Sequence, residues 1–149
     1  MNSEIRTLEP KPLWNKFADL NAVPRPSKKE ERVIEFMKTF GTNLGLETIE
    51  DEVGNVIIRK PATKGMEDRK TVTMQSHLDM VHQKNNDTKF DFDTQGIDMY
   101  VDGDWVRAKG TTLGADNGLG VATIMAILES VSIEHPEICL LYTSDAADD

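Results

Sequence analysis

Three segments of the chain repeat apolar residues every three or four positions, which is the spacing of an amphipathic helix. Pro12 opens the first segment, and proline suits the first turn of a helix. The second follows Ser27, and the third follows the glycine-rich segment 110–120. Such stripes usually face a core, so we interpret them as packing surfaces. The apolar positions are Leu13, Trp14, Phe17 and Leu20 in the first helix, Val33, Ile34, Met37, Phe40 and Leu44 in the second, and Val121, Ile124, Met125, Ile127 and Leu128 in the third.

The second helix carries signals at both of its ends. Ser27 and Glu30 have the spacing of a capping box, in which the serine side chain accepts a hydrogen bond from a free backbone N–H. We therefore predict that this helix begins at Ser27. Gly41 or Gly45 is predicted to end it, because glycine adopts the left-handed conformation without a steric penalty.

Shorter runs rich in β-branched and alternating apolar residues predict strands. Turns are expected at Gly54–Asn55 and Asp102–Gly103, and the polar stretches 61–68 and 83–95 are expected to be surface loops. Helices that alternate with strands favour an α/β fold with a central sheet. The predicted strands are 46–52, 55–60, 70–75 and 137–143, together with a hairpin over 99–107.

Composition and charge narrow the class of protein. A length of 149 residues suits one domain, and 38% hydrophobic with 29% charged residues is typical of a soluble globular chain. The net charge of −9 argues against nonspecific nucleic-acid binding, which needs a basic surface. No apolar run is long enough to cross a membrane, and residues 1–11 lack the apolar core of a secretory signal, so we expect the cytoplasm. The single cysteine, Cys139, excludes an intrachain disulfide and a thiolate cluster, and we expect an inert thiol in a buried strand.

Two residues at the end of the predicted strand 70–75 are candidates for chemistry. His77 and Asp79 are two positions apart, so their side chains share a face in extended backbone. Imidazole is a good ligand for zinc-like metals, and a nearby carboxylate can accept the other ring N–H and fix the tautomer. A histidine hydrogen-bonded for structural reasons is the alternative that this spacing leaves open.

Asp116 lies between Gly114 and Gly118 in a segment dense in glycine. Glycines permit positive φ and close backbone approach, so the loop can present one carboxylate at a helix start in a crowded site. A plain helix cap by Asp116 or Asn117 is the alternative. Phosphate binding is disfavoured, because the loop lacks the lysine and the third glycine of the nucleotide-binding motifs and carries a carboxylate at its centre.

The remaining candidates are weaker. His82 follows the site strand and could reach a substrate, although a surface position is the simpler interpretation. His135 precedes Pro136 in a connection, where we expect exposure to solvent. Ser76 neighbours His77, but adjacent strand residues point to opposite faces, so we do not expect it to act as a nucleophile.

The segments 76–81 and 110–118, in this order and spacing, resemble motifs of the M20 metallopeptidases, and among these the aminoacyl-histidine (cytosolic nonspecific) dipeptidases are the most similar. The resemblance also includes the stretches 24–27, 51–56 and 105–108 and covers roughly residues 12–141. It implies that residues 1–141 are the N-terminal part of a zinc-peptidase catalytic domain, with a mixed central sheet flanked by helices. The family's lid domain, which helps full-length members form homodimers, has no counterpart in this sequence.

The resemblance also implies roles for the candidate residues. His77 would be a ligand to one zinc, Asp79 would be the catalytic partner that orients His77, and Asp116 would bridge two metals. Two Zn²⁺ ions, which Co²⁺ or Mn²⁺ could replace, would polarise the scissile carbonyl and lower the pKa of a bridging water. The implied activity is hydrolysis of dipeptides, including those with a C-terminal histidine.

The last residues, 142–149, depart from the family. Its members continue with Thr-x-Asp-Glu-Glu, where the first glutamate is the general base and the second a zinc ligand. Ala146 and Ala147 stand at these positions, so neither role is filled. The tail also resembles adapter-derived ends of metagenomic fragments, which leads to the hypothesis of a truncated gene model with weak or no activity, prone to aggregation through exposed apolar sheet surface. The alternative is a non-enzymatic fragment or pseudoenzyme that keeps the fold and binds at most one metal.

Overall fold

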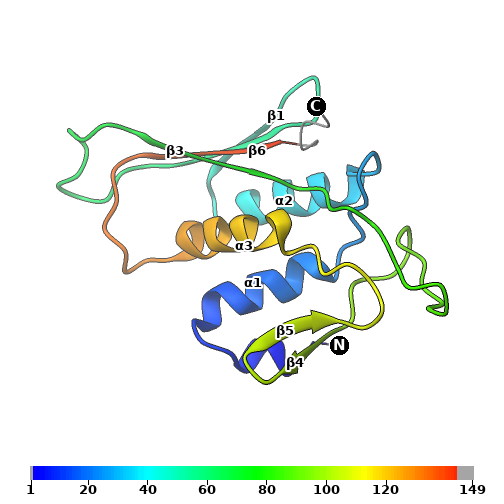
Figure 1. The fold of residues 1–149 in the computed structure, drawn as a ribbon. Coiled ribbons are helices and arrows are strands. Elements are labelled where there is room, and N and C mark those ends of the chain that lie inside the picture. Colours follow the sequence, from blue (N-terminus) through cyan, green and yellow to red (C-terminus); the bar gives the residue numbers. More distant parts are fainter. Residues whose placement is uncertain (1, 144–149) are drawn as a thin grey trace.

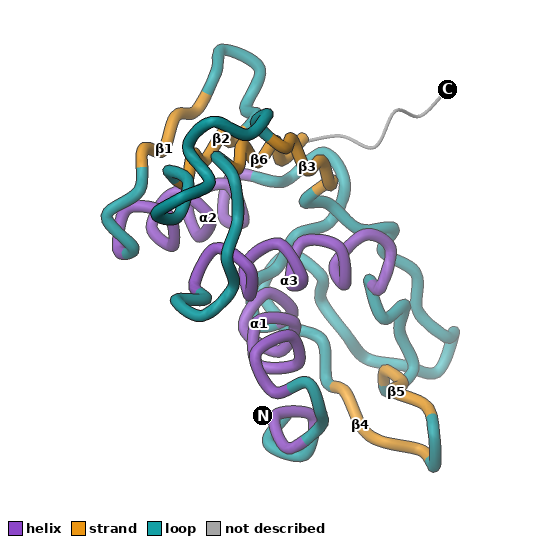
Figure 2. Tube along the Cα trace, turned by 90° about the vertical axis from the view of Figure 1, so that its left-hand side faces the viewer, coloured by secondary structure: helices purple, strands orange, loops and turns teal. Residues whose placement is uncertain are grey.

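In the computed structural model, which describes residues 2–143, a four-stranded sheet carries the long helices on one of its faces (Figure 1). Helices α2 and α3 pack against the sheet, and α1 packs against the far side of α3, beside the small β4–β5 hairpin (Figures 1 and 2). The predicted α/β class is therefore confirmed. In chain order the elements are η1 (Ile5–Thr7), α1 (Lys11–Asn21), α2 (Glu31–Asn43), β1 (Glu47–Glu50), β2 (Val56–Lys60), β3 (Val72–His77), β4 (Met99–Asp102), β5 (Trp105–Ala108), α3 (Ala115–Glu129) and β6 (Ile138–Thr143).

The main sheet is mixed, with the strand order β1-β2-β6-β3. The pairs β1–β2 and β2–β6 are antiparallel, whereas β6 and β3 are parallel. The β1–β2 turn contains Gly54 at φ +86°, and the β4–β5 turn contains Gly103 at φ +58°, as predicted for both hairpins. Parallel pairing places the carboxyl ends of β3 and β6 at the same edge of the sheet, and the candidate site lies there.

The two faces of the sheet differ in what covers them. Alternate residues of β6 point into the core beneath the sheet, so Leu140 and Tyr142 are fully buried. On the opposite face the register aligns Ile49, Ile57 and Leu141 in one apolar row, and Ile49 is 42% exposed. No helix of residues 2–143 covers this row (Figure 1). Association of the chain through this open face stays a prediction.

Two apolar clusters hold the layers together. One lies between the sheet and helices α2 and α3, and the other lies between α1, α3 and the β4–β5 hairpin. Each cluster joins segments that are far apart in the chain, and this contact holds the helices in place against the sheet and the hairpin. The first cluster contains Leu20, Val33, Met37, Val56, Ile58, Leu78, Val121, Ile124, Met125, Leu128, Ile138, Leu140 and Tyr142, and the second contains Ile5, Phe17, Ala18, Met80, Ile97, Met99 and Ala122.

The predicted start of the second helix is wrong. Helix α2 begins at Glu31, after an N-cap residue, Glu30, whose side chain makes no capping hydrogen bond. The Ser27 hydroxyl instead donates a hydrogen bond to the Asp79 carboxylate, 52 residues further along the chain. A tertiary partner has therefore replaced the local one that the spacing suggested. The other end agrees with the prediction, because the chain leaves the helix through Gly45 at φ +71°.

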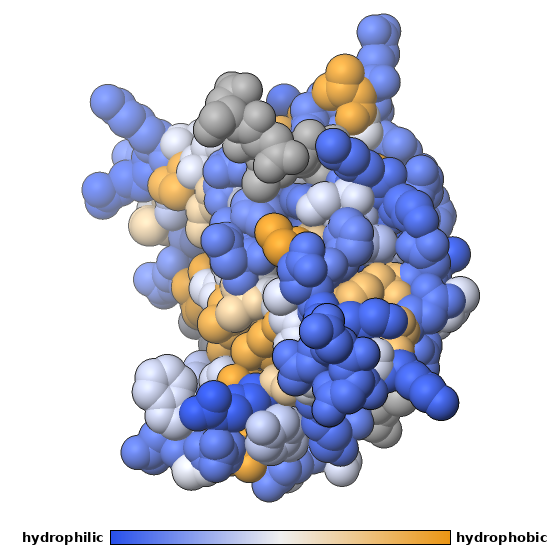
Figure 3. Space-filling model, turned by 45° about the vertical axis from the view of Figure 1, so that its right-hand side comes forward, coloured by the Kyte–Doolittle hydropathy of each residue, from blue (hydrophilic) through white to orange (hydrophobic). Residues whose placement is uncertain are grey.

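The surface agrees with the acidic, highly charged composition. Figure 3 shows a side of the molecule that is mostly hydrophilic, with smaller apolar areas between the polar side chains. Within residues 2–143, none of the helices has the length and apolar character needed to span a membrane.

Candidate metal centre

The candidate ligands lie where two segments meet at one edge of the sheet. Strand β3 ends at His77, and the loop at the start of α3 brings Asp116 to this end of the strand. The parallel partner strand β6 ends at the same level, with Thr143 opposite His77. In open α/β sheets, ligands usually bind outside the carboxyl ends of the strands. The position therefore agrees with a binding or catalytic role for His77.

The imidazole of His77 lies between two carboxylates. Its Nδ1 is 2.9 Å from Oδ1 of Asp79, and its Nε2 is 3.1 Å from Oδ1 of Asp116. The Asp79 side chain is only 5% exposed, whereas that of Asp116 is 95% exposed and that of His77 is 18% exposed. The Nδ1 side of the ring is thus held by a buried carboxylate, and the Nε2 side faces a carboxylate that is exposed to solvent. The prediction that His77 and Asp79 share a face is confirmed.

Asp79 is held on its far side as well. Its Oδ2 accepts a hydrogen bond of 2.5 Å from the Ser27 hydroxyl, which also lies 3.2 Å from the carbonyl oxygen of Met80. Backbone pairing reinforces this contact, since Met80 donates its N–H to the carbonyl of Arg25 and Ser27 donates its own to the carbonyl of Met80. The carboxylate therefore has a fixed orientation, with Oδ1 directed at His77.

The loop before α3 exposes Asp116 instead of burying it. Gly114 is the N-cap of α3 and has φ +72°, a left-handed conformation that glycine tolerates. The next turn is irregular, because Asp116 and Asn117 have non-helical backbone angles. Gly114 has no side chain with which to cap the helix, and regular helical geometry begins only after Asp116 and Asn117, so a helix cap by one of these residues stays the alternative. The Asp116 carboxylate faces His77.

Sequence reasoning missed Arg25, which lies directly beneath the centre. Its side chain is 1% exposed and donates hydrogen bonds to the carbonyl oxygens of Leu78, Asp79 and Gly114 and to the side chain of Asn21. Burial lowers the pKa of the guanidinium to about 10, with the charge of Asp79 acting in the opposite direction. The only signal in the sequence is an arginine between two prolines, which does not identify partners this distant.

The two site atoms that face each other suit a zinc-like ion. Imidazole nitrogen and carboxylate oxygen are common zinc ligands, and the 3.1 Å between His77 Nε2 and Asp116 Oδ1 is close to the roughly 3.3 Å expected across one tetrahedral zinc. Among residues 2–143, however, no group of three or more His, Cys, Asp or Glu side chains is placed to hold a metal. The described residues thus fit part of a metal centre and do not complete one. Ala146 and Ala147, which the resemblance places at the family's glutamate positions, lie outside the described residues.

The other candidate residues lie apart from this centre. His82 is exposed, with its ring centroid 5.7 Å from that of Phe92, in agreement with the surface interpretation. The expectation that His135 is exposed is wrong, since it is 4% exposed and its backbone N–H donates to the Thr63 hydroxyl. Cys139 is half-buried instead of buried, because strand alternation turns it to the open face of the sheet.

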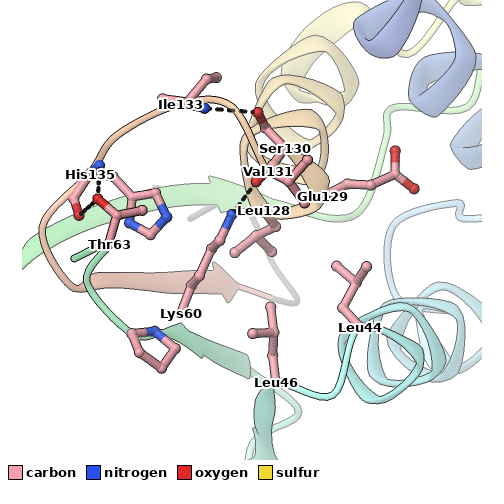
Figure 4. A pocket seen from close by; sticks show the side chains of 11 residues that line it. Leu44, Leu46, Lys60, Thr63, Leu128, Glu129, Ser130, Val131, Ile133 and His135 are labelled. Atoms are coloured by element: carbon pink, nitrogen blue, oxygen red, sulfur yellow. Dashed lines mark hydrogen bonds between the residues drawn. The ribbon is translucent and has the colours of Figure 1, made fainter.

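A pocket of about 310 Å³ opens at the opposite end of α3 (Figure 4). Lys60 lines the pocket, and its Nζ donates hydrogen bonds to the carbonyl oxygens of Ile127 and Ser130, where α3 ends. The pKa of Lys60 is lowered by partial burial. None of the candidate ligands lines this pocket, so it is separate from the centre at His77.

Comparison with known proteins relates the whole chain to peptidases, although no family model matches it. It is 48% identical to the cytosol non-specific dipeptidase of Escherichia coli K12 over 99% of the chain. The crystal structure of aminoacylhistidine dipeptidase from Vibrio alginolyticus superposes on 98% of the chain with a TM-score of 0.95 and 50% identity. A dinuclear metal-binding peptidase of the M20 family, the YXEP protein of Bacillus subtilis, shares the fold with a TM-score of 0.51 and 17% identity, covering 87% of this chain and 34% of its own.

These matches concern one part of the known proteins. The chain spans 31% of the length of the E. coli dipeptidase and 30% of the chain from V. alginolyticus. The matched region is the N-terminal part of a catalytic domain, which is the fold that the sequence predicts. The boundary expected at residue 141 stays a prediction, and Tyr142 and Thr143, beyond it, belong to strand β6.

Proposed function

Because the chain belongs with the M20 metallopeptidases and corresponds to the N-terminal part of their catalytic domain, we propose that it contributes one half of a two-metal dipeptidase site. The observation that carries this proposal is the His77 imidazole between a buried and an exposed carboxylate. The buried partner is hydrogen-bonded on both of its oxygens, as an orienting group would be. The exposed partner is accessible from solvent, as a metal ligand must be.

In this proposal the three side chains have separate roles. Asp79 accepts the N–H of His77 Nδ1, which leaves the lone pair of Nε2 directed toward Asp116. His77 and Asp116 would hold the metals, Asp116 as the ligand that two ions would share, and Asp79 would act through His77. When bound, two Zn²⁺ ions, or Co²⁺ or Mn²⁺ in their place, supply a polarised substrate carbonyl and a water of lowered pKa. A purely structural histidine would not need an exposed carboxylate at its outer nitrogen.

The proposed substrates are dipeptides, including those with C-terminal histidine. The names of the two similar proteins support this choice, since one is called a non-specific dipeptidase and the other an aminoacylhistidine dipeptidase. The E. coli protein is also named as cytosolic, which supports a proposed cytoplasmic location. Homodimer formation is proposed only for full-length members of the family.

The second candidate is a non-enzymatic fold that binds at most one metal. It is favoured by the absence, within residues 2–143, of a third side chain placed to complete a metal site. Ala146 and Ala147 point the same way, because alanine can neither take a proton nor bind a metal. For the 149-residue chain by itself we therefore propose little or no turnover.

The experiment that tests both candidates compares the 149-residue chain with a chimera. In the chimera, residues 1–143 replace the matching part of the E. coli dipeptidase, and hydrolysis of an Xaa-His dipeptide is measured with added Zn²⁺. We expect turnover from the chimera and not from the 149-residue chain. His77→Ala should abolish turnover of the chimera, whereas His82→Ala, which removes an exposed histidine outside the centre, should leave it unchanged.

Two results would contradict the proposal. Turnover that survives His77→Ala would show that this histidine is not part of the site. Robust turnover by the 149-residue chain alone would show that the general base is not missing from it. The natural E. coli dipeptidase, measured in parallel, controls for the assay and the metal.

A further inference from the structure

Arg25 is the most deeply buried charged side chain near the candidate centre, and the proposed roles of the ligands do not account for it. It follows α1 between two prolines and is 1% exposed. Burying an unpaired guanidinium donor carries a large desolvation penalty. Both Nη atoms of Arg25 are paired, whereas its Nε has no hydrogen-bond partner among residues 2–143. The identity of those partners shows what Arg25 holds together.

The guanidinium joins the two segments that carry the candidate ligands. Its Nη1 donates to the carbonyl oxygens of Leu78 at 3.0 Å and Asp79 at 3.2 Å, directly after His77. Its Nη2 donates to the carbonyl oxygen of Gly114 at 2.7 Å, two residues before Asp116, and to Oδ1 of Asn21 at 2.8 Å. One rigid planar group therefore fixes the end of β3 relative to the loop before α3.

Two glycines of the loop make room for this guanidinium. A Cβ atom added to Gly114 would lie 2.6 Å from Arg25 Nη2 and 2.8 Å from the sulfur of Met80. A Cβ added to Gly118 would lie 2.6 Å from the same Nη2 atom and 3.0 Å from the ring of Phe17. The contacts of 2.6 and 2.8 Å are shorter than side-chain carbons tolerate, so Arg25 or Met80 would have to move. Because Gly114 and Gly118 have no side chains, the loop around Asp116 leaves space for the guanidinium of Arg25.

The backbone around Arg25 adds a second connection to the same strand end. Arg25 accepts a hydrogen bond from the N–H of Met80 at 3.0 Å, and Pro26 pairs with Met80 as a short parallel bridge. Two residues on, the Ser27 hydroxyl reaches the Asp79 carboxylate. The segment 25–27 consequently holds the strand end through both backbone and side chains.

We propose that Arg25 is a positioning residue that sets the distance between His77 and Asp116, and thereby the metal affinity of the centre. The proposal rests on the proposed function, because it assumes that these two residues bind a metal. The three carbonyl acceptors make the role geometric: a lysine keeps the charge but presents a single nitrogen, which cannot reach both segments in the fixed pattern of a guanidinium.

The test is a Co²⁺ titration of the chimera described above, in which the rest of the metal site is present, followed by the visible absorption of the bound ion, with Zn²⁺ competition for affinity. Arg25→Lys, Arg25→Met and Gly118→Ala are compared with the unsubstituted chimera. Each should weaken Co²⁺ binding about tenfold or more, the effect expected when an outer partner of a metal ligand is lost, and should change the absorption spectrum. Gly118→Ala retains every charge and displaces Arg25 only by its added methyl group.

A matched control separates positioning from a general loss of stability. Leu128 is buried at the other end of α3, ten residues or about 15 Å from Gly118. Leu128→Ala should lower the melting temperature without changing Co²⁺ affinity or spectrum. If an Arg25 variant fails to fold, Gly118→Ala and the control still decide the question.

The outcomes distinguish the two proposals. If the unsubstituted chimera binds no Co²⁺ that is lost in His77→Ala, the proposed function fails first. If it binds Co²⁺ and Gly118→Ala or Arg25→Lys binds it equally well with the same spectrum, the positioning role is wrong and Arg25 supplies only charge or packing. An equal loss of affinity in Leu128→Ala would also overturn it.

Discussion

The two halves of the candidate centre are built in opposite ways. The strand-end half places His77 against Asp79, a buried carboxylate that is also hydrogen-bonded to Ser27. The loop half presents Asp116, whose side chain is 95% exposed and whose backbone departs from helical geometry. The first half is fixed by tertiary packing before any ligand arrives. The second half is an accessible carboxylate on a loop. Arg25 holds this loop in position through its hydrogen bond to the carbonyl oxygen of Gly114.

Because of this difference, substitutions in the two halves should have different effects on the stability of the fold and on metal affinity. Removing a side chain from the buried half should destabilise the fold and weaken a metal together. Removing one from the exposed half should affect the metal and leave the fold unchanged. The following four substitutions test this separation through the free energy of unfolding and the melting temperature.

The largest loss of stability is expected for Asp79→Ala. The change leaves the ring of His77 and the hydroxyl of Ser27 without their buried acceptor, and removes the negative charge near Arg25. Breaking a buried charged network by removing one partner costs about 3 kcal/mol or more. Urea denaturation measures it, with Asp79→Asn as the milder control that keeps the shape. A loss below about 0.5 kcal/mol would mean that the buried half is not fixed by this carboxylate.

A smaller loss is expected for Ser27→Ala. The hydrogen bond from the Ser27 hydroxyl to the charged Asp79 carboxylate is 2.5 Å long, and bonds to charged groups contribute about 1.5–3 kcal/mol. We expect about 1.5 kcal/mol by urea denaturation. Ser132→Ala, at an exposed serine in the connection after α3, is the control and should change stability by less than about 0.5 kcal/mol. Equal effects of the two substitutions would contradict the role of Ser27 as an anchor.

Tyr142→Phe should stabilise the chain. The Tyr142 hydroxyl is buried next to the site strand and has no hydrogen-bond partner among residues 2–143, and burial raises the pKa of this group well above its usual 10. Removing an unsatisfied buried hydroxyl while keeping the ring should add about 1 kcal/mol. Because the folded pKa is raised, the wild-type chain should lose stability as the pH rises above about 10, where the unfolded tyrosine ionises. The Phe variant should lose less over that range, and an unchanged alkaline profile would contradict the assignment.

The smallest effect on stability is expected for Asp116→Asn. The side chain is 95% exposed, so the melting temperature should shift by no more than about 2 °C. Metal affinity, measured by Co²⁺ titration, should nevertheless fall by more than about 100-fold, beyond the loss expected for an outer hydrogen-bond partner. A fall in melting temperature comparable to that of Asp79→Ala would remove the contrast between the two halves.

The parts of the molecule that the sequence predicts correctly are those governed by local periodicity and short spacing. The helical stripes, the two hairpins and the shared face of His77 and Asp79 depend on neighbours within a few residues, and all are confirmed. The glycine-flanked Asp116 also lies at the site, although the spacing alone could not show which side chain it faces. Its role as a ligand stays a prediction.

The errors concern residues whose partners lie far away in the chain. Ser27 has the spacing of a cap, but Asp79 competes for its hydroxyl and offers a charged acceptor. His135 was expected in solvent, yet its connection packs beside the Thr63 loop and buries it. The stretch 24–27 enters the family resemblance, but the sequence gives no sign of what Arg25 contacts, because its partners are mainly backbone carbonyls, which carry no residue identity. Local patterns cannot report such contacts.

The close approach of Gly118 to Arg25 has a consequence for protein engineering. Alanine is normally preferred to glycine inside a helix, so consensus or stability-guided libraries would propose it at position 118. In this fold, the added methyl group would lie 2.6 Å from the guanidinium. A selection that randomises positions 25 and 118 together should therefore return them as a linked pair, with alanine at 118 enriched only where position 25 has a shorter side chain.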